Sequence, residues 1–136
     1  MSEAILLDTH VAIWLTEGTL PNDSLASVVD ARFAGKALIS PATAWEAGLL
    51  AKRGRFVFEP DPQGWFLWLL NEARLLEAPL SARILIDSCQ LPGQLHDDPA
   101  DRMLIATARA LDCALMTRDK AILDYAAQGH VKAIGC

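Results

Sequence analysis

The sequence predicts an α/β fold in which a parallel sheet is covered by helices on both faces. Short apolar runs, such as Ala4–Leu7 and Ala37–Ile39, have the length of buried strands. Longer segments with apolar residues at helical spacing separate these runs, and such alternation is typical of parallel sheets. Acidic residues stand where apolar runs stop, as Asp8 does after Ala4–Leu7. With 136 residues, 52% of them hydrophobic, the chain is expected to form one domain over residues 1–136.

Local signals place the elements of the N-terminal half. Leu25, Val28 and Phe33 recur at helical spacing, and Ser40-Pro41 resembles an N-cap followed by a proline in the first helical turn. Gly54 is expected to end the helix that starts at Pro41. The expected elements are a strand at Ala4–Leu7, helices at Thr9–Leu15 and Asp23–Ala34, a strand at Ala37–Ile39, and helices at Pro41–Arg53 and Asp61–Glu72.

The C-terminal half continues the alternation. Asp98-Pro99 is a second pair of N-cap and proline, and it opens an Ala- and Leu-rich helix. The expected elements are a short strand at Leu75–Ala78, a helix at Ser81–Ser88, a loop at Gln90–Asp97, a helix at Asp98–Leu111, a strand at Ala114–Met116, a helix at Lys120–Ala127 and a strand at Val131–Ile134.

The net charge of −5 argues against a protein that coats nucleic acid without specificity, because such proteins are usually basic. It does not exclude an enzyme that holds nucleic acid locally. Basic residues do cluster at Lys52–Arg55, and Arg102, Arg118 and Lys120 stand beside acidic residues. The simpler interpretation of Lys52–Arg55 is a solvated helix end whose charge favours the C-terminal dipole.

Cysteine content and the N-terminus predict a cytoplasmic protein. Cys89, Cys113 and Cys136 are odd in number and form no CxxC pair, so they are expected to be reduced thiols. Cys113 lies in an apolar stretch and is expected in the core. The first eight residues have no basic region or long apolar segment, so no signal peptide is expected. No apolar run approaches the roughly 20 residues needed to span a membrane.

Four acidic residues are the candidate site: Asp8, Glu46, Asp101 and Asp119. Three of them stand at expected strand exits or helix starts, and ligands in α/β folds gather at the carboxyl ends of the strands. Two carboxylates about 4 Å apart at an effective dielectric of about 20 repel by roughly 4 kcal/mol. A hard divalent cation relieves this repulsion, and ligands that are all oxygen favour Mg²⁺ or Mn²⁺.

Helix capping is an alternative role for three of these acids. Asp8 and Asp119 each precede an expected helix, and Asp98 with Asp101 resembles a capping box. Glu46 fits this alternative poorly, because it shares a helix flank with Ala42 and is expected to be at least half buried. Buried glutamate is rare unless it is paired or binds a metal.

Other catalytic motifs are absent from the sequence. There is no GxxxxGK[ST] phosphate loop, no GxGxxG after the first strand, no GxSxG elbow and no HExxH. The segment Asp8-Thr9-His10 lacks the second acid of a DxD phosphatase motif. Four tryptophans can stack on bases, but the usual burial of this residue favours core positions for Trp14 and Trp45.

Four segments together resemble PIN-domain proteins, in particular toxins of the VapC type. Their order matches the family across essentially the whole chain, and the segments around Asp8 and Asp101 are the specific ones. One departure is Ala100, where the family often carries a larger apolar residue. The segments are Leu6–Leu15 (LLDTHVAIWL), Ser40–Glu46 (SPATAWE), Leu91-Pro92 with His96–Ala106 (HDDPADRMLIA), and Thr117-Arg118-Asp119 followed by Tyr125.

The resemblance implies a three-layer α/β/α PIN-like domain with a central, mostly parallel sheet. It also implies Mg²⁺- or Mn²⁺-dependent ribonuclease activity, a small antitoxin partner and a homodimer. Asp8, Glu46, Asp101 and Asp119 are then expected to hold one or two divalent ions. Thr9 and Thr117 are expected to orient these carboxylates from behind. Asp98 is expected to cap its helix first and to assist the metal second.

The expected activity is endoribonuclease cleavage of single-stranded or loop RNA, by the toxin of a toxin–antitoxin pair. The antitoxin is expected to insert a basic residue, preferably arginine, among the four carboxylates and to lay a helix along a groove near Trp14. Two alternatives stay open: a metal-dependent phosphatase for a small phosphoester, and a catalytically silent protein-binding module.

Overall fold

A computed structural model of the chain describes residues 3–136. Its centre is a sheet of five strands in the order β3-β2-β1-β4-β5, and every pair of neighbours is parallel. The prediction of a three-layer α/β/α fold with a mostly parallel sheet is therefore confirmed. The strands are β1 (Ile5–Leu7), β2 (Ala37–Ile39), β3 (Leu76–Glu77), β4 (Ala114–Thr117) and β5 (Lys132–Gly135).

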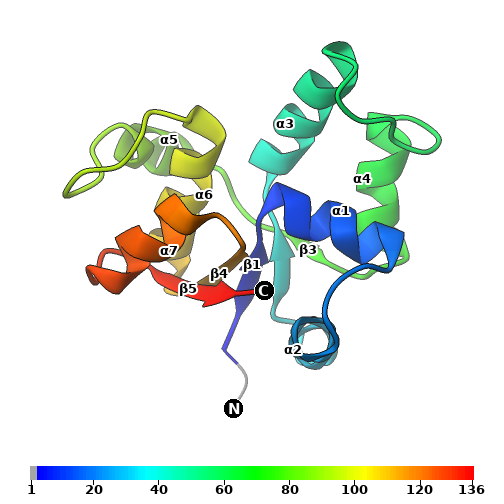
Figure 1. The fold of residues 1–136 in the computed structure, drawn as a ribbon, viewed down its shortest axis with the longest axis horizontal. Helices are drawn as coiled ribbons and strands as arrows, with labels where there is room; N and C mark the ends of the chain where they lie inside the picture. The colour runs from blue at the N-terminus through cyan, green and yellow to red at the C-terminus, as the bar shows by residue number, and fades with distance from the viewer. Residues whose placement is uncertain (1–2) are drawn as a thin grey trace.

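Helices cover both faces of this sheet. Figure 1 shows α1, α3 and α4 on one side, with α2 below them, and α5, α6 and α7 on the other side. The helices in the described part of the chain are α1 (Thr9–Glu17), α2 (Asn22–Phe33), α3 (Pro41–Lys52), α4 (Pro62–Asn71), α5 (Ala82–Ser88), α6 (Pro99–Leu111) and α7 (Lys120–Ala127).

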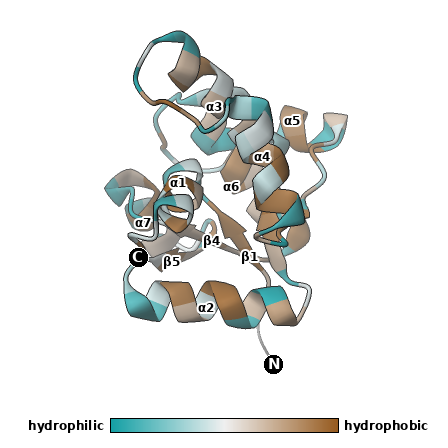
Figure 2. Cartoon of the chain, turned by 90° about the vertical axis from the view of Figure 1, so that its right-hand side faces the viewer, coloured by the Kyte–Doolittle hydropathy of each residue, from teal (hydrophilic) through white to brown (hydrophobic). Residues whose placement is uncertain are grey.

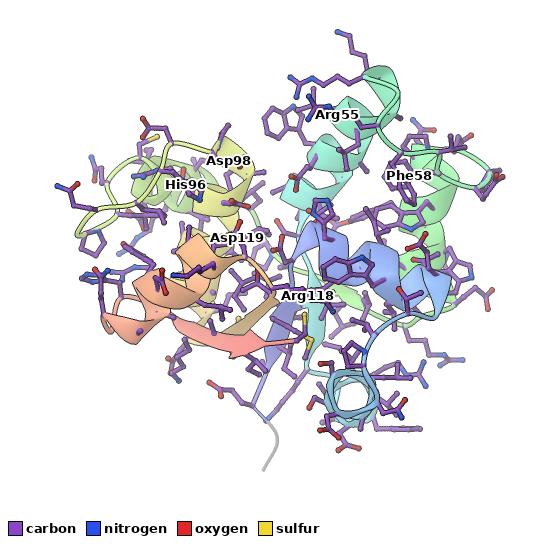
Figure 3. All side chains as sticks on the ribbon, in the orientation of Figure 1. Arg55, Phe58, His96, Asp98, Arg118 and Asp119 are labelled. Atoms are coloured by element: carbon purple, nitrogen blue, oxygen red, sulfur yellow. The ribbon has the colours of Figure 1, made fainter. Side chains whose placement is uncertain are left out.

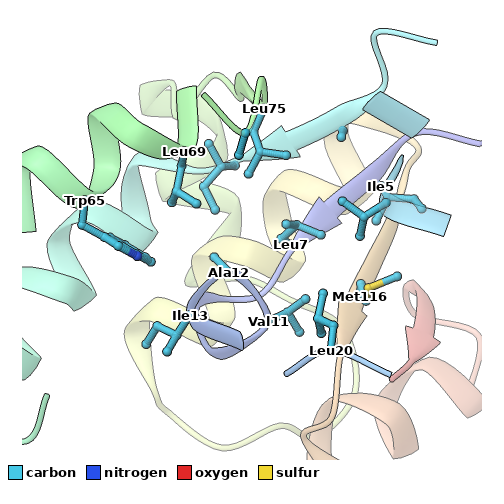
Figure 4. Packing of buried hydrophobic residues seen from close by; sticks show 14 of the residues in the cluster. Ile5, Leu7, Val11, Ala12, Ile13, Leu20, Trp65, Leu69, Leu75 and Met116 are labelled. Carbon is cyan, nitrogen blue, oxygen red and sulfur yellow. The ribbon is translucent and has the colours of Figure 1, made fainter. Parts of the chain in front are cut away.

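Strand β1 separates two hydrophobic cores. Side chains alternate along a strand, so Ile5 and Leu7 enter the core shared with α1, α2 and α4, whereas Leu6 enters the core shared with α6 and α7. Figure 4 shows Leu7 beside residues of α1 and Trp65 farther along the same core. The central strands are apolar up to Thr117 at the end of β4 (Figure 2), as expected for a parallel sheet buried on both faces.

The helix starts agree closely with the sequence signals. Ser40 caps α3 through its hydroxyl, Asp61 caps α4 and Asp98 caps α6, and each is followed by a proline in the first turn. The predicted boundaries differ from the observed ones by one or two residues. The last strand, for example, starts at Lys132 rather than Val131, because its pairing with β4 begins there.

Trp45 does not lie in the core, and its predicted burial is wrong. Its side chain on α3 is 47% exposed, while Trp65 on α4 is 2% exposed and fills the space beside Phe58. Trp14 is half-buried, and Cys113 is buried as predicted. None of the helices described over residues 3–136 is both long and apolar enough to cross a membrane.

Candidate functional site

A pocket of about 420 Å³ opens at the carboxyl ends of β1 and β4. All four candidate acids line it, although they come from four separate segments of the chain. A larger hollow of about 740 Å³ lies between α3 and α4, but its lining is mostly apolar. The residues of the acidic pocket are Asp8, His10, Trp14, Glu46, Asp98, Asp101, Arg118 and Asp119.

The β1 and β4 ends of the pocket are joined through Thr117. The Thr117 hydroxyl donates a 2.6 Å hydrogen bond to Oδ2 of Asp8, and its oxygen accepts the backbone N–H of Asp119 at 3.0 Å. Asp8 also accepts the Thr9 N–H at 2.7 Å through Oδ1, and Asp119 Oδ1 accepts the N–H groups of Ala121 and Ile122. Both acids therefore cap helices and line the pocket at once, so the two alternatives from the sequence do not exclude each other.

Asp98 precedes α6 and Asp101 stands in its first turn. Capping of the helix and negative charge in the pocket are divided between these two acids. Asp98 Oδ1 accepts the Asp101 N–H at 3.0 Å and is the cap, as predicted. The Asp101 carboxylate is left free of capping and lies 3.4 Å from Nε2 of His96. Figure 3 labels His96, Asp98 and Asp119 on this side of the pocket. Ligand atoms of His96, Asp101 and Asp119 all lie within 4.8 Å of one another, which is close enough to share one ion.

Glu46 reaches the pocket from α3. Its Oε1 atom is buried and has no hydrogen-bond partner among the described residues. Burial raises the pKa of this carboxyl and the Thr9 side chain lowers it, while the Thr9 and Thr43 hydroxyls are 3.0 Å apart. A buried oxygen without a partner is costly, so this atom is suited to a ligand that the pocket receives.

Three carboxyl groups of the pocket, those of Asp8, Glu46 and Asp101, have a raised pKa. Burial, the largest cause, and the negative charges of Asp8, Asp98, Asp119 and Glu46 together raise the pKa of Asp101 to about 8. Burial also raises the pKa of Asp8 and of Glu46, against the hydrogen bonds from Thr117 and Thr9 that lower them. A carboxyl that is protonated near neutral pH for this reason ionises readily when a cation arrives.

Three basic residues near the acids differ in where they point. Arg118 lies over the Trp14 ring, with its guanidinium carbon 4.1 Å from the ring centroid, and lines the pocket. Arg102 turns away and donates to the carbonyls of Ser88, Leu95 and His96, so it fixes the loop that carries His96. Lys120 pairs with Asp124 on the exposed side of α7.

His10, His96 and Arg118 were not among the candidate site residues from the sequence. His96 precedes the Asp98 cap by two residues, and its Nδ1 accepts the Asp98 N–H at 3.2 Å. This local bond holds the ring over the first turn of α6, where Asp101 stands. A histidine just before an Asp-Pro cap was the available signal, whereas the stacking of Arg118 on Trp14 depends on tertiary packing and has no local signature.

The donor set fits a hard divalent cation. Carboxylate oxygens predominate, and one of them is buried without a partner. Burial and mutual repulsion raise the pKa of Asp101, and a bound cation would lower it by relieving that repulsion. Three helix starts, at α1, α6 and α7, also meet at the pocket, and their N–H groups stabilise negative charge there. The arrangement can hold a cation and place a phosphate ester against it.

Comparisons with known proteins agree with this arrangement. The PIN domain family model matches residues 5–128. The chain is 25% identical over 121 residues to Ribonuclease VapC22 of Mycobacterium tuberculosis, covering 89% of this chain and 91% of that protein.

Solved structures share the fold at low sequence identity. VapBC2 from Rickettsia felis, bound to a promoter DNA fragment, matches with a TM-score of 0.71, 14% identity and coverage of 98% of each chain. DNA-bound VapBC from Salmonella typhimurium matches with a TM-score of 0.66, 14% identity and 98% coverage of each chain. FitAcB from Neisseria gonorrhoeae matches with a TM-score of 0.56, 21% identity and 96% coverage of each chain.

Proposed function

The chain belongs to the PIN domain family, and from this premise we propose that it is a divalent-metal-dependent endoribonuclease. We propose further that it is the toxin of a toxin–antitoxin pair and that it cuts single-stranded or loop RNA. The observation that carries the proposal is the convergence of Asp8, Glu46, Asp101 and Asp119 on one pocket. The similarity to a protein named Ribonuclease VapC22 supports the choice of RNA as substrate.

The four carboxylates would hold Mg²⁺ or Mn²⁺. When bound, the cation supplies charge neutralisation at the reacting phosphate and activation of the attacking water. The Thr117 hydroxyl keeps the Asp8 carboxylate in place, and Thr9, whose side chain lowers the pKa of Glu46, would orient that carboxylate. Flexible strands are the favoured substrates, because a phosphate must descend to the carboxylates and a stacked duplex resists this bend.

Arg118 suits the substrate side of the reaction. Its guanidinium lines the pocket beside Asp119, lies over the Trp14 ring and donates through Nε to the Cys136 backbone oxygen at 3.0 Å. A cation in this position can bind a phosphate oxygen of the strand without neutralising the acids. Asp98 remains the cap of α6 and contributes negative charge at the rim.

The proposal includes a cytoplasmic homodimer controlled by a small antitoxin. A metal-dependent ribonuclease free in the cytoplasm would damage its host, so an inhibitor is required. An antitoxin arginine inserted among the four carboxylates would replace the cation there, since its planar fork bonds carboxylates in pairs. The purified complex should then lose inhibition as Mg²⁺ is raised, and more readily when that arginine is changed to glutamine. If inhibition changes neither with Mg²⁺ concentration nor with loss of the arginine, the antitoxin blocks the enzyme in another way.

The activity itself is tested with an unstructured oligoribonucleotide and Mg²⁺ or Mn²⁺. The wild-type chain should cut it, EDTA should stop the reaction, and Glu46→Gln and Asp119→Asn should each abolish it. Asp124→Asn is the matched control, because Asp124 is an exposed acid on α7 paired with Lys120. Turnover of a generic phosphomonoester without RNA cleavage would favour the phosphatase instead. Absence of Mn²⁺ binding in calorimetry would favour the silent binding module.

A further inference from the structure

A second pocket adjoins the acidic one at the far end of α3. It has a volume of about 460 Å³, and it shares His10, Glu46 and Asp98 with the acidic pocket, so these three residues form a common wall. Its other walls are of a different character, aromatic, aliphatic and basic. They are formed by Trp45, Leu49, Leu50, Arg53, Arg55, Pro99 and Ala100.

The geometry of α3 explains how these residues come together. Trp45, Leu49 and Arg53 are spaced by four residues and therefore lie along one stripe of the helix. Gly54 then adopts a φ of +65°, a left-handed conformation that ends the helix, and the Arg55 N–H bonds to the Leu50 carbonyl at 2.9 Å. This turn returns Arg55 to the wall of the pocket. Figure 3 shows Arg55 at the outer end of α3, across from Asp98.

Three side chains of this pocket, those of Trp45, Arg53 and Arg55, have no evident role in the described fold. The Trp45 side chain is 47% exposed, and within residues 3–136 its ring stacks on no other ring or guanidinium. Arg53 and Arg55 form no ion pair in the described part of the chain. The helix dipole favours basic residues only within the last turn, so it does not account for Arg55 beyond Gly54.

We propose that this pocket is a nucleotide subsite for the RNA strand next to the bond that is cut. The proposal rests on the ribonuclease function proposed above and adds a binding site to it. The base would stack on Trp45, and the neighbouring phosphate would be bound by Arg53 and Arg55, the pairing of aromatic face and cations that single strands require. The strand would then continue past His10 to the four carboxylates.

The wall shared with the acidic pocket favours a nucleotide over an acidic peptide. A peptide rich in Asp and Glu would satisfy the arginines but would bring its charge against Glu46 and Asp98. A nucleic acid strand brings its next phosphate to the same carboxylates, where the cation of the reaction is required to receive it. The exposed indole of Trp45 can stack on a base of a nucleic acid strand, whereas Asp and Glu side chains of a peptide offer it no aromatic partner.

Binding is measured by fluorescence anisotropy of a labelled, unstructured oligoribonucleotide of mixed sequence. The Asp101→Asn background prevents cleavage. Trp45→Ala should raise Kd by about 5-fold to 160-fold, the range for loss of one base stack, and Trp45→Phe should restore most of the affinity. Arg53→Ala with Arg55→Ala should raise Kd and flatten the salt dependence by roughly 0.7 in log–log slope for each phosphate that is no longer neutralised.

The matched controls are Trp68→Ala and Arg83→Ala, which change exposed residues on α4 and α5 outside the pocket. In the cleaving enzyme the pocket variants should raise KM more than they lower kcat. If the wild type cuts RNA and the pocket variants bind it as the controls do, the subsite is wrong and the ribonuclease stands. If they lose affinity only for the antitoxin, the pocket is a protein site. If the wild type neither binds nor cuts RNA, both proposals fail.

Discussion

The hydroxyl of Thr117 donates to Asp8 across 109 positions of the sequence, at 2.6 Å and without exposure to solvent. The same oxygen accepts the backbone N–H of Asp119. One side chain at the end of β4 therefore positions two acids of the pocket, and it opposes the effect of burial on the pKa of Asp8.

Thr117→Val should weaken the site without removing any carboxylate. The change keeps the shape of the side chain but deletes the donor, so the pKa of Asp8 should rise further and the Asp119 N–H should lose its acceptor. Loss of a residue that orients metal ligands typically costs about 10-fold to 100-fold in metal affinity or activity. Calorimetric titration with Mn²⁺ and the cleavage rate should both show the loss, and Thr117→Ser should restore most of it. An unchanged Mn²⁺ affinity in the valine variant would contradict this role.

Asp101→Asn should abolish cleavage while leaving the metal-free fold equally or more stable. The folded protein holds the pKa of Asp101 near 8, above the ordinary value of 3.8. A raised pKa of this kind gives stability that is present below about pH 4 and is lost as pH rises through 8. The metal-free wild type should therefore lose more stability than the variant between these values. Urea denaturation in EDTA at pH 5 and pH 9 measures the difference, and equal losses would contradict the prediction.

Asp98→Ala should destabilise the fold, in contrast to Asp101→Asn. Asp98 accepts the Asp101 N–H and caps α6, and loss of such a cap costs about 0.5–2 kcal/mol. Asp61 offers a matched control, since it also caps a helix through a 2.7 Å bond to an N–H and precedes a proline, but it lies outside the acidic pocket. Asp61→Ala should cost slightly more in thermal unfolding, because Asp98→Ala also relieves repulsion among the carboxylates.

Metal binding near neutral pH should release a proton. The pKa of Asp101 is about 8, so at pH 7 the metal-free carboxyl is mostly protonated and must ionise to bind a cation. Apparent Mn²⁺ affinity should rise with pH up to about 8 and then level off. Calorimetry in buffers of different ionisation enthalpy counts the protons released. A count near zero at pH 7 would show that Asp101 is already ionised or does not take part.

The sequence predicted the fold because each element has a signal within a few neighbouring residues. It predicted the convergence of the acids because parallel strands end at one edge of the sheet. Strand runs, caps and the Asp-Pro pair each have a signature within a few residues, and parallel strands bring their carboxyl ends to one edge. Trp45 shows the limit of such reasoning. Its helical spacing is compatible with a core or a surface position. In the structure Trp65 occupies the core beside Phe58, whereas Trp45 stays 47% exposed.

The stacking of Arg118 on Trp14 was beyond prediction for a related reason. Arg118 lies over Trp14 because β4 inserts beside β1, whereas His96 has a local bond to the Asp98 N–H and lies in a loop that Arg102 fixes. These contacts join segments far apart in the chain or depend on the path of an irregular loop. The Glu46 atom without a partner is also a tertiary property, since the helical flank predicts burial but not the absence of a donor.

The position of β4 between β1 and β5 has a consequence for synthesis on the ribosome. Strand β1 is made first, but its partner β4 starts at Ala114, so the edge that β4 occupies stays open until most of the polypeptide has emerged. Asp8 then also lacks the hydroxyl of Thr117, and Asp119 has not yet been added. A growing chain would carry no complete acidic pocket, so the proposed nuclease activity would begin only after translation has passed Asp119.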